Sequence, residues 1–359
     1  MIKLKQEYIR KSLIEFYANM KKYKLSIINS DSMYCSRGGV APFLRNMHED
    51  LSKVFDVEYY YIPDSWKKVK LPGRVKILVY LLTQWSKLKK TDFILSHIPE
   101  GTWLIGHLGV PYAHIYHGNS NPMTISKWWF GRYFKAVFDY FYNYINSHCP
   151  LIYSVGKAEG TIKKLYNPLN QNVKPKPYCE RKGLIFAGRL HPVKNVDRLI
   201  RIYSILPESL RKDLPFYIAG DGEMMQALKD QVDLLGLSDQ VIFLGLISNT
   251  EMMEIDSTKQ ILLMASSTEG FPTAIAEAFS VGVPVISTAV GDIPSILRNN
   301  EQGFLFPLDF RDEDYANAIV EILNDYDRFS KAALKSSTLF NKSTITNEVI
   351  ADILQIIEK

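Results

Sequence analysis

Short apolar runs alternate with longer segments of helical periodicity along most of the chain. In the first half, strands are predicted at residues 25–30, 57–62, 92–97, 112–117 and 151–155, with helical segments at 73–90 and 126–147. In the second half, strands are predicted at residues 183–188, 216–220, 241–245, 261–266, 284–288 and 303–306, followed by a helical C-terminal region. This alternation is typical of parallel sheets whose strands are joined by crossover helices.

A polar, proline-bearing segment at residues 175–182 separates the two series and predicts a linker. We therefore expect an α/β protein with two doubly wound, Rossmann-like domains, residues 1–174 and residues 175–359. The terminal helices are candidates to cross back to the first domain. A ligand crevice is expected where the carboxyl ends of the strands of the two domains face each other.

The composition favours a globular protein, because 47% of the 359 residues are apolar and 23% are charged. The three cysteines, Cys35, Cys149 and Cys179, lack metal-binding spacing and predict a reducing compartment without a disulfide framework. The longest apolar run, residues 77–82, is far shorter than the roughly 20 residues that a membrane span needs. No secretory signal is visible, so the sequence predicts a cytoplasmic protein.

Charge is distributed unevenly between the two halves. Residues 1–174 contain 25 Lys and Arg against 12 Asp and Glu, whereas residues 175–359 contain 18 against 26. The basic half predicts an anionic partner, such as a membrane surface, although simple attraction between the two halves would account for the same pattern. No nucleic-acid-binding motif is present, and we expect no nucleic-acid partner.

The strongest candidate site lies in the stretch STEGFPTAIAEAFSVGVPVIST, residues 267–288. Glu269 precedes a predicted helix that has Pro272 at its first position, and Glu277 lies inside that helix. The N-terminus of a helix attracts phosphate, and the helix advances about 7.5 Å from Pro272 to Glu277. The two carboxylates can therefore flank a diphosphate, one meeting a sugar and the other a ribose, which describes a nucleotide sugar.

Three further features can contribute to such a site. Arg189 and Lys194 follow a strand and a glycine turn, where two cations can neutralise a departing diphosphate. The Gly38–Gly39 pair follows the first strand and can bring backbone amides to a ligand, although such a pair is ordinarily only a turn. His117 ends a predicted strand, a position where histidine often has a purely structural role.

These segments resemble the retaining glycosyltransferases of family GT4, the glycosyl transferases group 1, which have the GT-B fold. EGFPTAIAE is similar to the family's E-x7-E signature, GRLHPVKN to its phosphate-binding segment, and GDGE at 220–223 to its turn after a strand. The resemblance spans roughly residues 24–340 and is weaker in the first half. It implies a GT-B fold with an N-terminal acceptor-binding domain and a C-terminal donor-binding domain.

The resemblance also implies a role for each candidate residue. Glu269 would hold hydroxyls of the donor sugar, and Glu277 would bind the ribose. Arg189 and Lys194 would stabilise the leaving diphosphate, and His117 would contact the sugar near its 6-hydroxyl. The remaining donor-binding candidates are backbone contributors: Gly38, Gly39, Gly270, Phe271 and Pro272.

The implied reaction is transfer of a hexosyl group, with a UDP-hexose donor favoured, to a lipid-linked oligosaccharide or surface-polysaccharide acceptor. Retention of configuration by front-face displacement is expected. We expect no cofactor beyond the nucleotide-sugar co-substrate and no metal, because cations are available to hold the diphosphate. Asp325 and Asp327 have the spacing of a metal-binding pair but follow a helical pattern, which indicates a solvated helix end.

Two basic segments of the first half are candidates for contact with an anionic membrane. Residues 126–148 are aromatic with interleaved cations, and residues 1–23 form a predicted amphipathic helix. The alternatives are that the aromatic segment is a core helix and that the first residues are an extension without function. The membrane interpretation predicts a peripheral protein on the inner face of the plasma membrane.

Three other functions remain open from the sequence. A sugar-nucleotide epimerase with the same fold would act on the donor without an acceptor, and a soluble synthase would use a soluble one. A non-catalytic nucleotide-sugar-binding partner of another transferase is the third. The presence of Glu269, Glu277, Arg189 and Lys194 together favours an active enzyme over the last of these.

Overall fold

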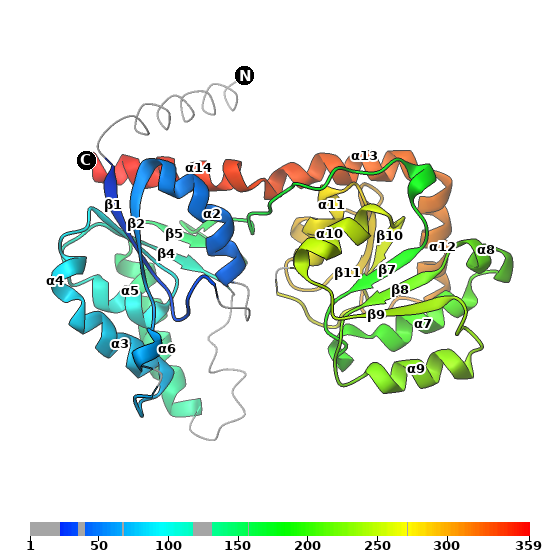
Figure 1. The fold of residues 1–359 in the computed structure, drawn as a ribbon, viewed down its shortest axis with the longest axis horizontal. Coiled ribbons are helices and arrows are strands. Elements are labelled where there is room, and N and C mark those ends of the chain that lie inside the picture. Colours follow the sequence, from blue (N-terminus) through cyan, green and yellow to red (C-terminus); the bar gives the residue numbers. More distant parts are fainter. Residues whose placement is uncertain (1–21, 35–39, 67, 118–130, 157, 271) are drawn as a thin grey trace. The chain divides into compact units, whose positions relative to one another are not determined.

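The computed structural model describes residues 22–34, 40–66, 68–117, 131–156, 158–270 and 272–359. The chain forms two compact units. Unit 1 contains the described residues up to Asn170 together with Lys342–Lys359, and unit 2 contains Gln171–Asn341. Each unit is a six-stranded parallel sheet with helices on both faces (Figure 1). The prediction of two doubly wound α/β domains is confirmed.

The sheet of unit 1 has the strand order β2-β1-β3-β4-β5-β6. Its strands are β1 (Tyr23–Ile28), β2 (Phe55–Tyr60), β3 (Phe93–Ser96), β4 (Tyr112–Tyr116), β5 (Ile152–Ser154) and β6 (Lys163–Lys164). All pair in parallel. The five strands predicted in this half are present, whereas β6 was not predicted, because two residues are too few to show a period.

Among the described residues of unit 1, the helices are α2 (Val40–Val54), α3 (Gly73–Thr83), α4 (Trp85–Leu88), α5 (Pro99–Ile105), α6 (Gly131–His148) and α14 (Lys342–Ile357), with the 3-10 turn η1 (Asp64–Trp66). The helical segment predicted over residues 73–90 is present as two helices, α3 and α4. The helix is interrupted at Gln84, which lies between α3 and α4 and whose φ of −95° and ψ of 4° lie outside the helical region. A departure at one residue does not disturb the apolar period, so the pattern could not reveal it.

The last helix, α14, returns to unit 1 and packs against α2. Lys342 Nζ lies 2.8 Å from Glu49 Oε2, and Ser343 donates a hydrogen bond of 2.8 Å to Asp50 Oδ2. On the sheet side, Asp352 of α14 accepts a hydrogen bond of 2.7 Å from the Tyr153 hydroxyl of β5. Helix α14 therefore completes unit 1, although the residues immediately before it, Gln171–Asn341, belong to unit 2.

The sheet of unit 2 has the order β12-β11-β10-β7-β8-β9. Its strands are β7 (Leu184–Ala187), β8 (Phe216–Ala219), β9 (Val241–Gly245), β10 (Ile261–Leu263), β11 (Val285–Thr288) and β12 (Gly303–Phe306). All pair in parallel, and each was predicted. The helices are α7 (Val196–Ile205), α8 (Glu208–Asp213), α9 (Met225–Leu234), α10 (Asn249–Ser257), α11 (Thr273–Ser280), α12 (Asp312–Asn324) and α13 (Tyr326–Ser336), with 3-10 turns η2 (Tyr178–Glu180), η3 (Pro192–Lys194), η4 (Ile293–Ser295) and η5 (Ser337–Phe340).

A buried tyrosine binds the backbone of two neighbouring strands of unit 2, directly after β10 and within β11. The Tyr315 hydroxyl accepts a hydrogen bond of 3.1 Å from Met264 N and lies 2.8 Å from the carbonyl oxygen of Ile286. Its ring is fully buried in the core, where it stacks on Phe306. The Tyr315 hydroxyl therefore fixes the backbone at Met264, where the loop after β10 begins.

The segment expected as a linker, residues 175–182, packs into unit 2. Arg181 is buried, and its guanidinium donates hydrogen bonds to the carbonyl oxygens of Lys176 (2.8 Å) and Val281 (2.6 Å). Composition suggested a linker because the segment is polar, but a buried arginine that binds backbone carbonyls ties it to the end of α11.

Candidate functional site

Ligand sites in doubly wound sheets lie at the carboxyl ends of the strands, where the direction of winding reverses. In unit 2 this point falls between β7 and β10, which are neighbours in the sheet. The two loops that leave these strands are tied together. Asn195 Nδ2 donates a hydrogen bond of 2.8 Å to Ala265 O, and Ser267 N donates one of 2.8 Å to Val193 O.

Glu269 and Lys194 lie on these two loops and form an ion pair. Lys194 Nζ is 2.6 Å from Glu269 Oε1, and Ser266 Oγ donates a hydrogen bond of 2.7 Å to the same oxygen. The carboxylate side chain is 8% exposed and that of the lysine 21%. Sequence reasoning assigned these residues to different parts of the donor, and the structure brings them into direct contact. Lys194 and Ser266 can therefore hold the Glu269 carboxylate in a fixed orientation.

Helix α11 starts beside this pair. Pro272 is the N-cap of α11, with φ −81° and ψ 92°, so the expectation of a first helical position is wrong by one residue. The extended ψ of Pro272 places it before the helix. Its side chain offers no acceptor to the first N–H groups of the helix, which leaves the positive end of α11 suited to an anion.

One face of α11 lines a cavity of about 520 Å³. Thr273 and Glu277, four residues apart, share that face with Ala274. The other lining residues lie at or directly after the carboxyl ends of β7, β8 and β9, or on α10: Ala187, Gly188, Arg189, Ala219, Gly220, Asp221, Gly222, Leu246, Ile247 and Met252. Arg189 and Glu277 therefore border one cavity.

Close packing of two loops forms one wall of this cavity. A Cβ on Gly220 would lie 1.8 Å from Gly188 O, and one on Gly222 would lie 2.2 Å from Leu190 O. Gly220 also has a φ of +142°, which side chains rarely adopt. These contacts explain why the GDGE turn needs glycine. By contrast, a Cβ on Gly270 would meet no atom within 4 Å, so glycine there leaves open space beside Glu269.

Burial raises the pKa of Glu277 to about 7. A second carboxyl group, that of Asp256 on α10, lies nearby and is almost fully buried. Burial, and then the charge of Glu277, raise the pKa of Asp256 well above its usual range. Asp256 was not identified from the sequence, because nothing in the pattern of α10 shows that its carboxyl group faces the core.

His117 directly follows β4 in unit 1 and belongs to a group of buried rings. Its Nε2 lies 2.7 Å from Nδ1 of His97, and Phe43 of α2 packs edge-on against it with ring centroids 4.8 Å apart. Burial lowers the pKa of His117 to about 3, so its imidazole is neutral at pH 7. A neutral imidazole held in this way can exchange a hydrogen bond with a hydroxyl group. His97 was not predicted, because only the tertiary fold brings β3 and β4 together.

Three predicted residues, Gly38, Gly39 and Phe271, lie outside the described residues. Among the residues that the structure describes, no group of three or more His, Cys, Asp or Glu side chains could hold a metal ion. Asp325 and Asp327 lie at the exposed junction of α12 and α13, where Asp325 pairs with Arg328. No described helix is both long and apolar enough to span a bilayer.

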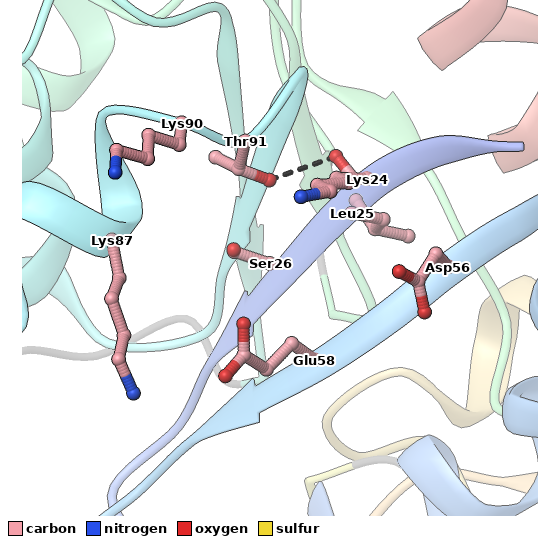
Figure 2. A pocket seen from close by; sticks show the side chains of 8 residues that line it. All are labelled: Lys24, Leu25, Ser26, Asp56, Glu58, Lys87, Lys90 and Thr91. Carbon is pink, nitrogen blue, oxygen red and sulfur yellow. Dashed lines mark hydrogen bonds between the residues drawn. The ribbon is translucent and has the colours of Figure 1, made fainter.

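A separate cavity of about 170 Å³ lies at the amino ends of the strands of unit 1 (Figure 2). Figure 2 shows Lys87 and Lys90 on one side and Asp56 and Glu58 of β2 on the other. The Thr91 hydroxyl donates a hydrogen bond of 2.8 Å to Lys24 O at its rim. Its charges are mixed, and it lies at the end of the sheet opposite to the usual ligand crevice.

Comparisons with known proteins agree with this architecture. Residues 170–336 match the family model described as glycosyl transferases group 1. The D-inositol 3-phosphate glycosyltransferase of Mycobacteroides abscessus is 31% identical over 175 residues, which are 48% of this chain and 39% of that protein. An Escherichia coli UDP-Gal:alpha-D-GlcNAc-diphosphoundecaprenol alpha-1,3-galactosyltransferase is 26% identical over 298 residues, 75% of this chain and 76% of that one.

The crystal structure of Anabaena HepE in complex with UDP matches this chain with a TM-score of 0.70 at 17% sequence identity. The match covers 93% of this chain and 100% of the HepE chain. The two parallel sheets and the site at the switch point of the second sheet therefore define a protein with the GT-B fold. Within residues 170–336, somewhat less than half of the chain, the sequence matches the family of glycosyl transferases group 1, and the relatives reported above are named glycosyltransferases. The predicted fold is confirmed, and the predicted resemblance to this family is confirmed for residues 170–336.

Proposed function

We propose that the protein is a retaining, metal-independent hexosyltransferase that uses a nucleotide sugar, with UDP-hexose favoured. The acceptor is a lipid-linked oligosaccharide or a surface polysaccharide. The observation that carries the proposal is the arrangement in unit 2 of Arg189 and Glu277 around one cavity, with the Lys194–Glu269 pair on the loops from β7 and β10. The names of the E. coli relative and the UDP-bound HepE structure support a UDP-sugar donor.

The donor would occupy this site in three parts. The nucleoside fills the cavity of about 520 Å³, within the range of small-molecule sites, and its ribose hydroxyls bind Glu277. The diphosphate lies at the N-terminus of α11 and beside Arg189. The hexose extends toward Glu269, whose carboxylate Lys194 and Ser266 hold in place.

The reaction follows from this placement by front-face displacement. The bond between the anomeric carbon and the phosphate oxygen breaks as the acceptor oxygen bonds to the same face of that carbon. The acceptor proton passes to the leaving phosphate oxygen. Arg189 and the end of α11 supply positive charge where the diphosphate gains negative charge. His117, which is neutral, contacts the sugar by a hydrogen bond.

The first test of this function is calorimetric titration of UDP and GDP into the protein with EDTA present. Micromolar binding of UDP with weak binding of GDP is expected. If UDP binds only after a divalent cation is added, metal independence is wrong. Incubation with UDP-hexose alone tests the epimerase alternative, because that enzyme would form a second nucleotide sugar without an acceptor.

We further propose that the protein works on an anionic membrane surface. Between Asp64 and Asp92 the sequence has eight Lys and Arg and no acidic residue. Within this stretch, α3 buries Ile77 and Leu81, yet its opposite face exposes Val75, Val79 and Leu82 by 43%, 36% and 53%. A helix that is apolar on both faces and flanked by lysines suits a lipid interface.

Co-sedimentation with vesicles tests this surface. Wild-type protein is expected to bind vesicles containing phosphatidylglycerol and to bind phosphatidylcholine vesicles weakly. The double variant Val79→Ser, Leu82→Ser is expected to lose this binding. Leu234→Ser removes an exposed leucine of α9 in unit 2 and is the matched control. Equal loss in both variants, or no binding by the wild type, would refute membrane contact through α3.

A further inference from the structure

A cavity of about 320 Å³ lies at the carboxyl ends of β1 and β2 in unit 1. It is lined by Ser32, Tyr59, Tyr61, Pro63, Asp64 and Tyr80. Ser32 follows β1, the residues from Tyr59 to Asp64 come from the end of β2 and η1, and Tyr80 comes from α3. This is the end of the sheet at which doubly wound domains bind ligands. The donor-site residues of unit 2 and His117 of unit 1 do not line this cavity.

Two of the three tyrosines that line this cavity are held by their neighbours. The Tyr59 hydroxyl lies 3.0 Å from Nδ1 of His48 on α2. Tyr80 packs edge-on against Trp66 of η1, with ring centroids 5.6 Å apart at an interplanar angle of 74°. All three lining tyrosines are partly exposed. Tyr59 and Tyr80 therefore offer aromatic surface in fixed orientations, which lowers the entropy cost of binding a ligand.

The chemistry of the lining selects a class of ligand. A sugar ring has an apolar C–H face that packs on an aromatic ring and a rim of hydroxyls that bind polar groups. Tyrosine rings, the Ser32 hydroxyl and the Asp64 carboxylate provide both kinds of contact. Asp64 is also the charged residue of this lining, and its negative charge disfavours a diphosphate or a phospholipid headgroup.

We propose that this tyrosine cavity is a subsite for an uncharged sugar residue of the acceptor glycan. The inference rests on the proposed transferase function and extends it to the acceptor. It also fits the membrane surface of α3, because Tyr80 lines the cavity and its neighbour Val79 is exposed on the apolar face of the same helix. A lipid-linked glycan can thus place its sugar in the cavity while its lipid stays in the membrane.

Saturation-transfer NMR on the full chain tests the subsite directly. The probes are methyl glycosides of glucose, galactose and N-acetylglucosamine, without nucleotide. At least one glycoside is expected to bind the wild type, with its ring C–H protons receiving the strongest saturation. Tyr61→Ala is expected to weaken this binding about tenfold, and Tyr61→Phe to restore most of it. Tyr140→Ala, which removes an exposed tyrosine of α6, is the matched control and should bind as the wild type does.

Two further measurements separate failure of the subsite from failure of the proposed function. UDP affinity is measured for every variant, and Tyr61→Ala should keep it, which also shows that unit 2 remains folded. Asp64→Asn is the second variant, in case Tyr61→Ala fails to fold. It changes an exposed residue without removing volume and should also weaken glycoside binding. UDP binding without any glycoside binding, or glycoside binding unchanged in Tyr61→Ala and Asp64→Asn, would overturn the subsite alone. Glycoside binding without UDP binding would overturn the transferase and leave a glycan site.

Discussion

Replacement of Glu277 by glutamine tests the donor site through the cost of burying a charge. The unfolded chain releases the Glu277 proton near the ordinary pKa of 4.5, whereas the folded chain holds it up to about pH 7. Protonation of Glu277 therefore contributes fully to the free energy of unfolding below pH 4.5. This contribution is lost as the pH rises to about 7. At about 1.4 kcal/mol per pH unit, ionised Glu277 costs unit 2 about 3 kcal/mol at pH 8.

The variant Glu277→Gln has nearly the same shape as the wild type and no charge. We expect it to be more stable than the wild type by about 3 kcal/mol at pH 8 and to differ little below pH 4.5. Urea denaturation across this pH range measures the difference. All five tryptophans lie at or before position 129, so fluorescence follows unit 1, whereas circular dichroism follows both units. Comparison of the two signals isolates unit 2.

The same variant should bind UDP about tenfold more weakly at pH 8, because an amide accepts weaker hydrogen bonds from the ribose than a carboxylate does. The control is Glu321→Gln, which changes an exposed glutamate of α12 and should alter stability by less than about 0.5 kcal/mol. A variant less stable than the wild type at pH 8 would refute the reasoning. So would a wild-type stability that stays constant between pH 4.5 and 7.

The remaining predictions concern three other positions. Glu269→Gln should lower kcat about 100-fold or more while calorimetry finds UDP affinity nearly unchanged, and an equal loss of both would contradict its contact with the sugar. Gly220→Ala places a Cβ 1.8 Å from Gly188 O and should lower the unfolding temperature of unit 2 by about 5 °C or more, whereas Gly270→Ala, which lies in the same unit and meets no atom within 4 Å, should not. His117→Asn should lower the rate without changing the shape of its pH profile between pH 5 and 9, because His117 is already neutral there. Loss of an inflection in that range would show that the histidine titrates during the reaction.

Most of the fold could be predicted from local patterns. Each of the eleven predicted strands is present, because a buried parallel strand needs an apolar run bounded by turn residues. The errors lie where a single residue or a distant contact decides the outcome. Gln84 breaks one helix without changing its apolar period, and Arg181 turns a polar segment into part of unit 2 through bonds to Val281 and Lys176.

The candidate site could be predicted in part, because its residues lie close together within two short segments. The spacing of Glu269 and Glu277 around the start of a helix, and the cations after β7, can be recognised without knowing the fold. The contact between Lys194 and Glu269 could not be predicted, because the order of strands in the sheet brings the two loops together. Asp256 and His97 were missed for the same reason.

The sequence by itself determined the alternation of strands and helices, the resemblance of residues 170–336 to the glycosyl transferases group 1 and the residue types of the candidate donor site. These properties depend on backbone periodicity and on spacing within a few turns of chain. The tertiary structure alone decided which charges meet, which groups lose water and which segments join each unit. The pKa of Glu277 is raised by burial among residues from other segments, and α14 completes unit 1 through contacts with residues roughly 300 positions earlier. Such properties arise from desolvation and long-range contact, for which a linear pattern carries no local signal.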